Sequence, residues 1–371
     1  MHRAHGGRRS VAECACEAKD RTMKALTPLG TFIDVPECAE SDTSSFRPED
    51  LQEAVQFYRR EGYVVIRGLL SPELCDAVRN GYRAEVLPSK TPILRQKNMR
   101  YERNRFDKDG FLVNPIFNVQ DLESRRFGRF KNATLDVLTH PGVAALTAAV
   151  LGTPRTKVIQ SMFFEAPAGT WAHQDSYYQD SGAGIGRCTA GWFALEDIDA
   201  GAGRFYVCPR SHKLMPLLRN AGELDFATGH HRYQHAVLEA IKRYDLPWHA
   251  PCLRKGDAIF WSSLTVHGSL GAERRGVSRT SLTAHYLPET DGMLQFHTRI
   301  RPQKLLPHNG MAVARLHDQD EWRNRAVRRV AASAPGTYAV VRKTAMRALF
   351  LAGKMRRAPA PVPVLPPDAV A

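Results

Sequence analysis

The stretch WAHQDSYY, Trp171–Tyr178, places His173 and Asp175 two positions apart in a run rich in strand-forming residues. In a β-strand, residues two apart point to the same face of the sheet. The imidazole of His173 and the carboxylate of Asp175 can therefore converge on one metal ion. A His-x-Asp pair alone is common by chance and more often forms a surface pair, so the metal hypothesis needs further ligands.

A second apolar run, Asp257–Trp261, supplies the missing ligand type further along the chain. It leads into VHGS, Val266–Ser269, in which His267 can complete a set of two histidines and one carboxylate. Three such ligands leave the other coordination positions open, which favours Fe(II) in an oxygen-using enzyme. We therefore predict that His173, Asp175 and His267 bind one metal ion.

Arg279 stands at the head of a third strand-like run, Thr280–Leu287. A guanidinium that projects from a strand into the same cavity suits a dicarboxylate co-substrate, because its planar fork matches a carboxylate bidentately. Two histidines, an aspartate and an arginine in this order form a four-part pattern that chance produces far more rarely than His-x-Asp alone.

These residues and several flanking stretches resemble the phytanoyl-CoA dioxygenase family of Fe(II)- and 2-oxoglutarate-dependent oxygenases. The resemblance covers roughly residues 51 to 288. The stretches that carry it are Glu61–Ser71, His173–Asp175, Trp192–Asp197, Cys208–Lys213 and Gly256–Ser269, followed by Arg279. Arg210 stands where the family's Pro-Gly-Ser-His-Lys turn usually has glycine, which puts the local turn geometry in question.

The resemblance implies a reaction and its cofactors. A member of this family uses Fe(II), 2-oxoglutarate and O2, and hydroxylates an unactivated C–H bond of a small organic or lipid-like substrate, with succinate and CO2 as co-products. In halogenating relatives a small residue replaces the aspartate and makes room for chloride. Because Asp175 fills that place here, hydroxylation is favoured over halogenation.

Four residues would bind the co-substrate on this interpretation. Arg279 would hold the far carboxylate of 2-oxoglutarate, and Ser269 would hydrogen-bond the same group unless it only caps its strand. Gln174 and Trp192 match family positions near the co-substrate. However, Gln174 would point away from its neighbours on an ideal strand, and Trp192 could equally be an ordinary core residue.

Two other functions remain open at this stage. The domain could be a non-catalytic jelly-roll binding protein for an anionic partner, or a 2-oxoglutarate oxygenase that performs desaturation or epoxidation in secondary metabolism. The presence of all three ligands and of Arg279 argues against the first. No segment specifies the substrate or the oligomeric state.

The periodicity predicts a mainly β fold with flanking helices, in which many short strands are separated by Gly and Pro turns. A double-stranded β-helix, that is a jelly roll of the cupin-like kind, fits this pattern and is the fold that the resemblance implies. We expect a flexible N-terminal arm over 1–45 and a jelly-roll oxygenase domain with N-terminal helices over 46–300. A basic helical extension over 301–357 and a Pro-rich disordered tail over 358–371 would follow.

Composition limits the compartment and the partners. The chain of 371 residues has no long apolar run and no secretory signal, and its seven scattered cysteines indicate free thiols, so we expect a cytoplasmic protein. The net charge is +14, and residues 321–357 contain ten basic residues and one acid. This distribution argues against nucleic acid at the metal site. It suggests instead a peripheral contact of residues 337–357 with an anionic membrane, unless that helix packs on the core.

Overall fold

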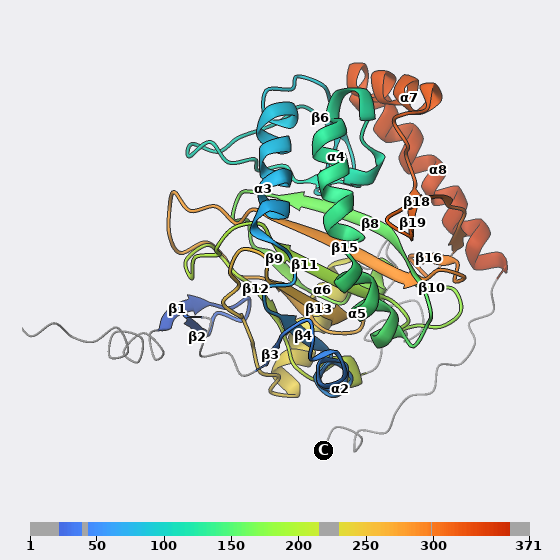
Figure 1. Cartoon of the computed structure of the whole chain (residues 1–371). Helices are drawn as coiled ribbons and strands as arrows, with labels where there is room; N and C mark the ends of the chain where they lie inside the picture. The colour runs from blue at the N-terminus through green and yellow to red at the C-terminus, as the bar shows by residue number, and fades with distance from the viewer. Residues whose placement is uncertain (1–21, 39–43, 215–229, 298, 357–371) are drawn as a thin grey trace, which may run out of the picture.

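The computed structural model describes residues 22–38, 44–214, 230–297 and 299–356 (Figure 1). The predicted disordered tail over 358–371 and the first 21 residues of the predicted arm lie outside these ranges. The architecture is mainly β with helices on one side of a large central sheet, which confirms the predicted fold class.

Nine strands form the large sheet, and five antiparallel strands at its centre carry most of the core. These are β8 (Thr156–Phe164), β15 (Ser281–Pro288), β11 (Thr189–Ala194), β13 (Ala258–Ser262) and β4 (Tyr63–Ile66), in that spatial order. Four further strands complete it: β7 (Ile116–Phe117), β18 (Lys304–His308), β19 (Met311–Arg315) and β3 (Ser45–Phe46).

A small sheet supplies the second layer of the jelly roll. Its central strand β14 (His267–Ser269) pairs antiparallel with β12 (Phe205–Val207) on one side and with β9 (Thr170–His173) on the other. A separate three-stranded sheet contains β10 (Gln179–Ser181), which follows β9 closely in the sequence, together with β16 (Met293–Gln295) and β17 (Arg299–Arg301). A short hairpin, β5 (Ile93–Leu94) and β6 (Tyr101–Glu102), lies outside both layers.

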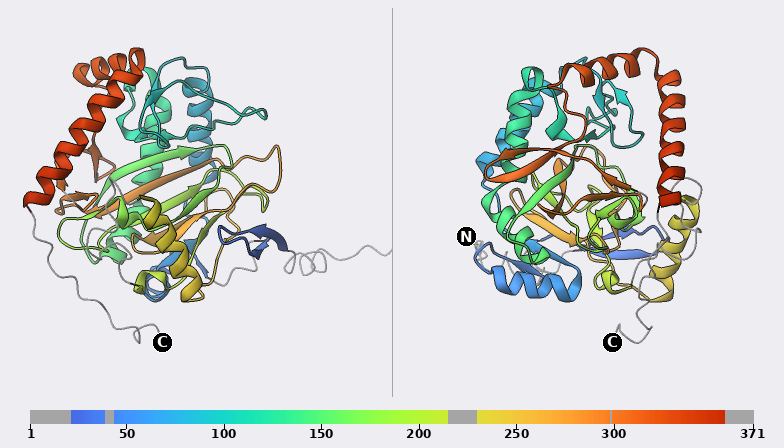
Figure 2. Two further views of the ribbon diagram at one scale, coloured as in Figure 1. Left: turned by 180° about the vertical axis from the view of Figure 1, so that it is seen from behind. Right: turned by 90° about the vertical axis from the view of Figure 1, so that its right-hand side faces the viewer.

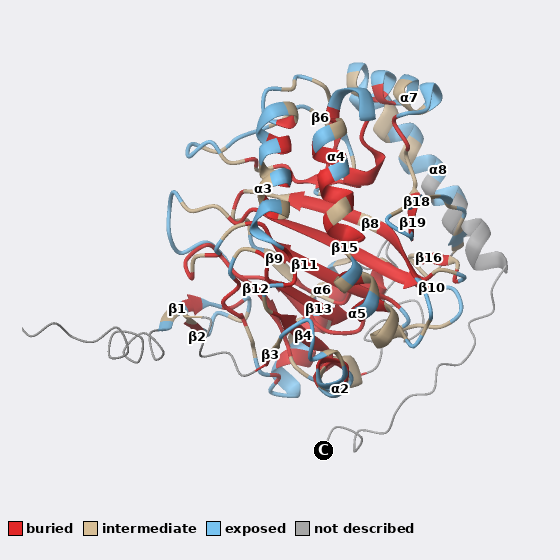
Figure 3. Ribbon diagram, in the orientation of Figure 1, coloured by how far each residue is buried: buried red, intermediate tan, exposed pale blue. Residues whose placement is uncertain are grey.

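Helices cover one face of the large sheet (Figures 1 and 3). They are α2 (Leu51–Glu61), α3 (Pro72–Gly81) with its π-helical continuation η2 (Tyr82–Val86), α4 (Ser124–Leu138) and α5 (Pro141–Leu151). Local sequence signals mark their ends: Ser71 caps α3 by accepting from the Leu74 N–H at 3.3 Å, Pro141 begins α5, and glycines in the left-handed conformation end α2 and α5.

Alternation along the strands separates the two faces of the large sheet. On β13, Phe260 packs with the helices, whereas Ile259 and Trp261 belong to a different cluster on the opposite face. Val64 and Val65 on β4 divide in the same way. Because side chains alternate with period two, each central strand contributes one face to the helical core and the other to the interior of the jelly roll.

The expectation of an irregular arm over 1–45 is wrong for part of that range. Strands β1 (Thr22–Leu26) and β2 (Phe32–Pro36) form an antiparallel hairpin. Ala25 and Val35 are buried in the cluster that includes residues of β9 and of helix α6 (His230–Arg243). Each strand buries only one residue fully, so its apolar periodicity was too weak to recognise from the sequence.

The predicted domain boundary at residue 300 is also wrong. Strands β18 and β19 continue the large sheet to Arg315, and β19 runs parallel to β8 with Val313 opposite Val158. Helices α7 (Trp322–Ser333) and α8 (Pro335–Arg356) follow, as the predicted basic helical extension requires. Val313 and Ala314 are buried, so this short segment becomes a strand by packing beside β8. The sequence did not indicate a strand here, because basic residues dominate the chain that follows.

Two further expectations concern thiols and membranes. Five cysteines among the described residues, Cys38, Cys75, Cys188, Cys208 and Cys252, are free thiols, as predicted. No single helix in the described part of the chain is long and apolar enough to cross a membrane. Helices α4 and α5 meet such a criterion only when taken together, across a 45° bend.

Gly62 connects the end of α2 to the loop that precedes His267. Its carbonyl accepts from the Ser262 N–H at 3.0 Å and from the Thr265 hydroxyl at 2.6 Å. Its φ is +83°, and a Cβ here would lie 2.6 Å from Thr265 Oγ1 and against the His212 ring. Gly152 also has positive φ, at +60°, but has open space around it.

We predict that Gly62→Ala destabilises the protein more than Gly152→Ala. Both substitutions force a left-handed alanine, at about 1–2 kcal/mol. Only Gly62→Ala adds a steric clash, typically about 1–3 kcal/mol more. Denaturant unfolding of the two variants beside the wild type measures the difference. Equal decreases in the free energy of unfolding would show that the loop around Thr265 accommodates the added Cβ without a loss of stability.

Candidate metal centre

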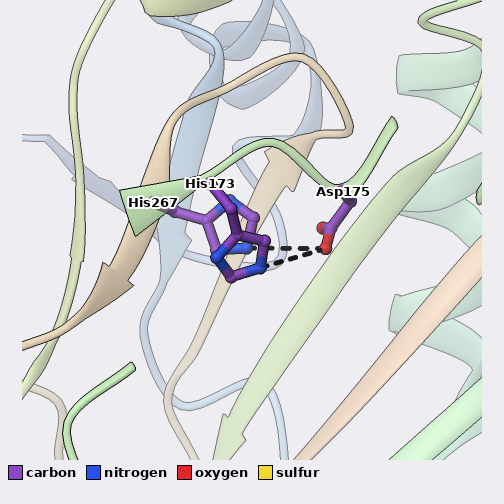
Figure 4. A group of neighbouring side chains, drawn as sticks. All are labelled: His173, Asp175 and His267. Carbon is purple, nitrogen blue, oxygen red and sulfur yellow. Dashed lines mark ion pairs between the residues drawn. The ribbon is translucent and has the colours of Figure 1, made fainter. Parts of the chain in front are cut away.

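Two neighbouring strands of the small sheet bring the predicted histidines together. His173 on β9 and His267 on β14 are direct cross-strand partners, and their ring centroids lie 4.3 Å apart. The Asp175 Oδ1 atom lies 3.7 Å from His173 Nε2 and 3.6 Å from His267 Nε2 (Figure 4). In the described part of the chain, these three side chains are the group of His, Cys, Asp or Glu residues arranged to hold a metal ion.

The chain leaves the strand between the two ligands, so the prediction of a continuous strand to Tyr178 is wrong. Strand β9 ends at His173, Gln174 remains extended with φ −108° and ψ 135°, and the 3-10 turn η4 (Asp175–Tyr177) follows. Because Gln174 is extended, the side chains on either side of it still point the same way, as the alternation argument requires. The turn then carries Asp175 towards the large sheet.

Backbone carbonyls fix the orientation of both imidazoles. His173 Nδ1 lies 2.8 Å from the Trp171 carbonyl oxygen, and His267 Nδ1 lies 2.9 Å from the Thr265 carbonyl oxygen. A carbonyl can only accept, so each Nδ1 carries the hydrogen and donates it. Both rings are therefore in the Nδ1–H tautomer, and their Nε2 lone pairs face Asp175. A histidine that binds a metal through Nε2 needs this tautomer.

Burial sets the charge state of the centre. It lowers the pKa of His173 and lowers the pKa of His267 to about 3, so both rings are neutral at physiological pH. Burial alone would raise the pKa of Asp175, but the contact with His285 opposes burial, and that pKa lies below its usual range. Two neutral imidazoles and one carboxylate result, which is the protonation state in which these groups bind divalent metals.

Two residues of the large sheet support the carboxylate and were not predicted. Trp261 on β13 donates its indole N–H to Asp175 Oδ2 at 2.8 Å, and His285 Nε2 on β15 lies 3.1 Å from Oδ1. Strand alternation could have identified His285, because it is six residues after Arg279 and therefore on the same face of the run. The contact with Asp175 could not be foreseen, because it joins two sheets.

Arg279 is buried without an acidic partner. Its guanidinium donates to the Ala168 carbonyl at 2.9 Å and to the Gly203 carbonyl, while Nε has no hydrogen-bond partner within the described residues. No ion pair joins it to a described carboxylate, and burial lowers its pKa to about 10. An unpaired buried guanidinium is costly, so this site is suited to an external carboxylate.

The remaining predicted residues lie around the centre with different contacts. Ser269 lies at the other end of β14 from His267, opposite Thr170 and Phe205. Trp192 on β11 belongs to the apolar cluster on the inner face and stacks near Phe205. Gln174 is fully buried, and its amide donates to the Leu264 carbonyl at 2.6 Å, so it braces the loop before His267.

Arg210, at the turn where the sequence departs from the usual glycine, adopts the left-handed conformation with φ +65°. Its guanidinium forms an ion pair with Glu61 at 3.0 Å. His212 Nε2 in the same turn lies 3.1 Å from the Arg59 carbonyl oxygen, so this residue connects the turn to the end of α2. A non-glycine residue therefore occupies the left-handed position of this turn, and the ion pair helps to offset the backbone strain.

The fold and the centre define a class of protein: non-haem iron dioxygenases that depend on 2-oxoglutarate. The profile of the phytanoyl-CoA dioxygenase family matches residues 58–277, and the chain belongs to this family. Its cofactors are Fe(II), 2-oxoglutarate and O2. The neutral histidines, the ionised Asp175 and the unpaired Arg279 fit these groups chemically.

Individual relatives are distant. The chain is 24% identical to the peroxisomal phytanoyl-CoA dioxygenase of Mus musculus, over 69% of its own length and 77% of the mouse protein. Among solved structures, the epimerase SnoN from nogalamycin biosynthesis, in complex with Fe3+, alpha-ketoglutarate and nogalamycin RO, is 20% identical with a TM-score of 0.50, covering 72% of this chain and 99% of that one. The alpha-ketoglutarate-dependent carbocyclase SnoK is 18% identical with a TM-score of 0.50, covering 67% and 88%. At these identities the likeness shows a shared fold.

Proposed function

We propose that this oxygenase hydroxylates an unactivated C–H bond of a small organic or lipid-like substrate at a metal held by His173, Asp175 and His267. The observation that supports this most directly is their buried cluster, with both imidazoles neutral and the carboxylate ionised. Bound iron and 2-oxoglutarate supply the oxidising chemistry, with succinate and CO2 as co-products. Asp175 occupies the place that a small residue would leave open for halide, which favours hydroxylation.

The small sheet orients the co-substrate in this proposal. Arg279 donates to the carbonyls of Ala168 and Gly203, which lie just before strands β9 and β12. Its guanidinium therefore lies at the Thr170 and Phe205 end of the small sheet, whereas the metal ligands are at the His173 and His267 end. Ser269 is two residues from His267 along β14, about 7 Å. A five-carbon dicarboxylate fits this spacing, with Arg279 and Ser269 at its far carboxylate.

An aromatic wall beside the metal ligands favours an organic substrate. Trp171 and Tyr178 are half-buried, and their rings lie 5.1 Å and 5.7 Å from the His173 ring between centroids. Trp171 also contacts the ring of His230 on α6. Such a wall presents apolar surface with few hydrogen-bonding groups, so it suits a hydrocarbon or aromatic portion next to the reacting carbon.

The purified protein, loaded anaerobically with Fe(II), should convert 2-oxoglutarate to succinate slowly on exposure to O2, even without its substrate. His173→Ala and Asp175→Ala each remove one of the three ligands and should reduce succinate formation to background, because the lost ligand weakens metal binding and changes the charge or geometry of the centre. Chromatographic quantification of succinate, with circular dichroism as the check of folding, measures this. Undiminished succinate from a folded Asp175→Ala variant contradicts the assignment.

Arg279→Lys should raise the KM for 2-oxoglutarate by about ten- to a hundred-fold. Lysine keeps the charge but loses the planar fork, and a charge-assisted hydrogen bond is worth about 1.5–3 kcal/mol. Arg274→Lys is the matched control, because Arg274 is close in sequence but pairs with Asp199 near the surface. An unchanged KM in Arg279→Lys would mean that another residue holds the far carboxylate.

We also propose a partner for the C-terminal helices, namely an anionic membrane surface. Residues 322–356 contain nine basic residues and no acid. Arg325, Arg328 and Arg342 bind the body of the protein, whereas Arg323, Arg329, Lys343 and Arg347 are exposed. Figure 2 shows α7 and α8 along one edge of the molecule.

Apolar side chains lie among these exposed charges. Trp322 on α7 and Val340 on α8 are each 67% exposed, and Val330 and Val341 are exposed as well. The apolar residues of α8 are divided: Tyr338 packs on the body, while Val341 and Ala345 face solvent. Packing on the core therefore accounts for only part of this face, and the exposed part combines apolar and basic residues, as interfacial helices do.

Vesicle sedimentation tests this contact. The protein should pellet with phosphatidylserine-containing vesicles but not with phosphatidylcholine alone, and salt should release it. Glutamine at Arg323, Arg329, Lys343 and Arg347 together should weaken binding on the order of a hundred-fold or more, since each basic residue contributes about 1 kcal/mol. Glutamine at Arg59, Arg83, Lys90 and Arg232, exposed elsewhere, is the matched control. Equal vesicle binding by both variants would contradict the proposed membrane contact. Concentration-dependent self-association of the protein in place of vesicle binding would contradict it as well.

A further inference from the structure

His285 is a buried imidazole whose role the family's ligand pattern does not define. It is 2% exposed, and its Nε2 lies 3.1 Å from Asp175 Oδ1. The contact falls short of an aligned hydrogen bond, and neither ring nitrogen has another hydrogen-bond partner in the described residues. A buried polar ring with nothing else to bind is costly unless it serves the group that it faces.

The strand directs His285 at the carboxylate. On β15, Leu282, Ala284 and Tyr286 pack into the helical core, so the alternate residues face the interior of the jelly roll. The neighbour of His285 on β11 is Ala190, a small residue. The pairing with β8 shifts register between His285 and Tyr286, which marks a local irregularity at this position.

Asp175 needs support that its own segment does not supply. It belongs to a 3-10 turn outside the small sheet, whereas both histidines are held in β-strands. Trp261 from the large sheet anchors Oδ2, so the direction of Oδ1 depends on a second contact. His285 is the residue of the large sheet that reaches Oδ1.

We propose that His285 is a positioning residue that donates its Nε2–H to Asp175 Oδ1 and, together with Trp261, turns the carboxylate towards His173 and His267. This rests on the proposed function of the three metal ligands. The large sheet then orients the carboxylate while the small sheet orients the imidazoles, so metal affinity depends on how the two sheets face each other. His285 lies outside the three-residue ligand group and contacts the centre through Asp175.

Metal binding without turnover tests this inference. Co(II) is titrated anaerobically into the full-length protein without 2-oxoglutarate, and affinity is measured by competition with a chromophoric chelator. His285→Leu removes the donor and should raise the Kd for Co(II) by about 10- to 100-fold. His285→Gln places an amide N–H close to the position of Nε2 and should stay within about three-fold of the wild type. Thr283→Val, two residues away on the same face of β15, is the matched control and should not change the Kd.

The outcomes separate the two proposals. If the wild type binds no Co(II), the proposed metal centre itself is wrong. If the wild type binds and His285→Leu binds equally well, only the positioning role is overturned. If His285→Gln loses affinity as His285→Leu does and also alters the visible Co(II) spectrum, His285 is a ligand and the positioning role is again overturned. His285→Phe, which retains a ring, replaces His285→Leu should that variant fail to fold.

Discussion

The centre of this structure depends on one buried carboxylate that bridges two sheets. Asp175 is removed from water, and burial opposes its charge. Three imidazoles and an indole N–H surround it, and these come from β9, β14, β15 and β13. A charge in such a place is tolerated only when it is well paired or bound to a metal. The layers of the jelly roll are therefore tied together at the point where chemistry is proposed to occur.

A second buried charge complements the first. Arg279 is enclosed at the opposite end of the small sheet, and carbonyl oxygens are its hydrogen-bond acceptors in the described structure. The anionic cluster at one end and the unpaired cation at the other make the interior electrostatically asymmetric. A dicarboxylate with one end at the proposed metal centre and the other at the guanidinium would match this asymmetry, as the proposed function requires.

The surroundings of the site show how loops acquire precise positions. His267 follows a loop whose Thr265 and Ser262 bind the carbonyl of Gly62, and Gln174 binds the carbonyl of Leu264. These contacts connect the end of α2, the turn after β9 and the start of β14. The two histidines of the proposed metal centre thus lie at strand ends and Asp175 lies in the turn after β9, and hydrogen bonds between distant segments support all three.

The amino-acid sequence by itself determined the family and the fold class and indicated the proposed ligand set, because each depends on local order: a His-x-Asp triplet, a distal His-Gly-Ser and an arginine a short way beyond. Helix ends likewise depend on local signals, since Ser71, Pro141 and Gly152 act on adjacent backbone. It did not determine the hairpin at Thr22–Pro36 or the strands β18 and β19, because these short segments bury few residues and become strands only by pairing with others. The contacts of Trp261 and His285 were likewise decided by tertiary structure. Each residue lies on a strand of the large sheet, and each contacts the carboxylate of Asp175, which is in the turn that follows β9 of the small sheet.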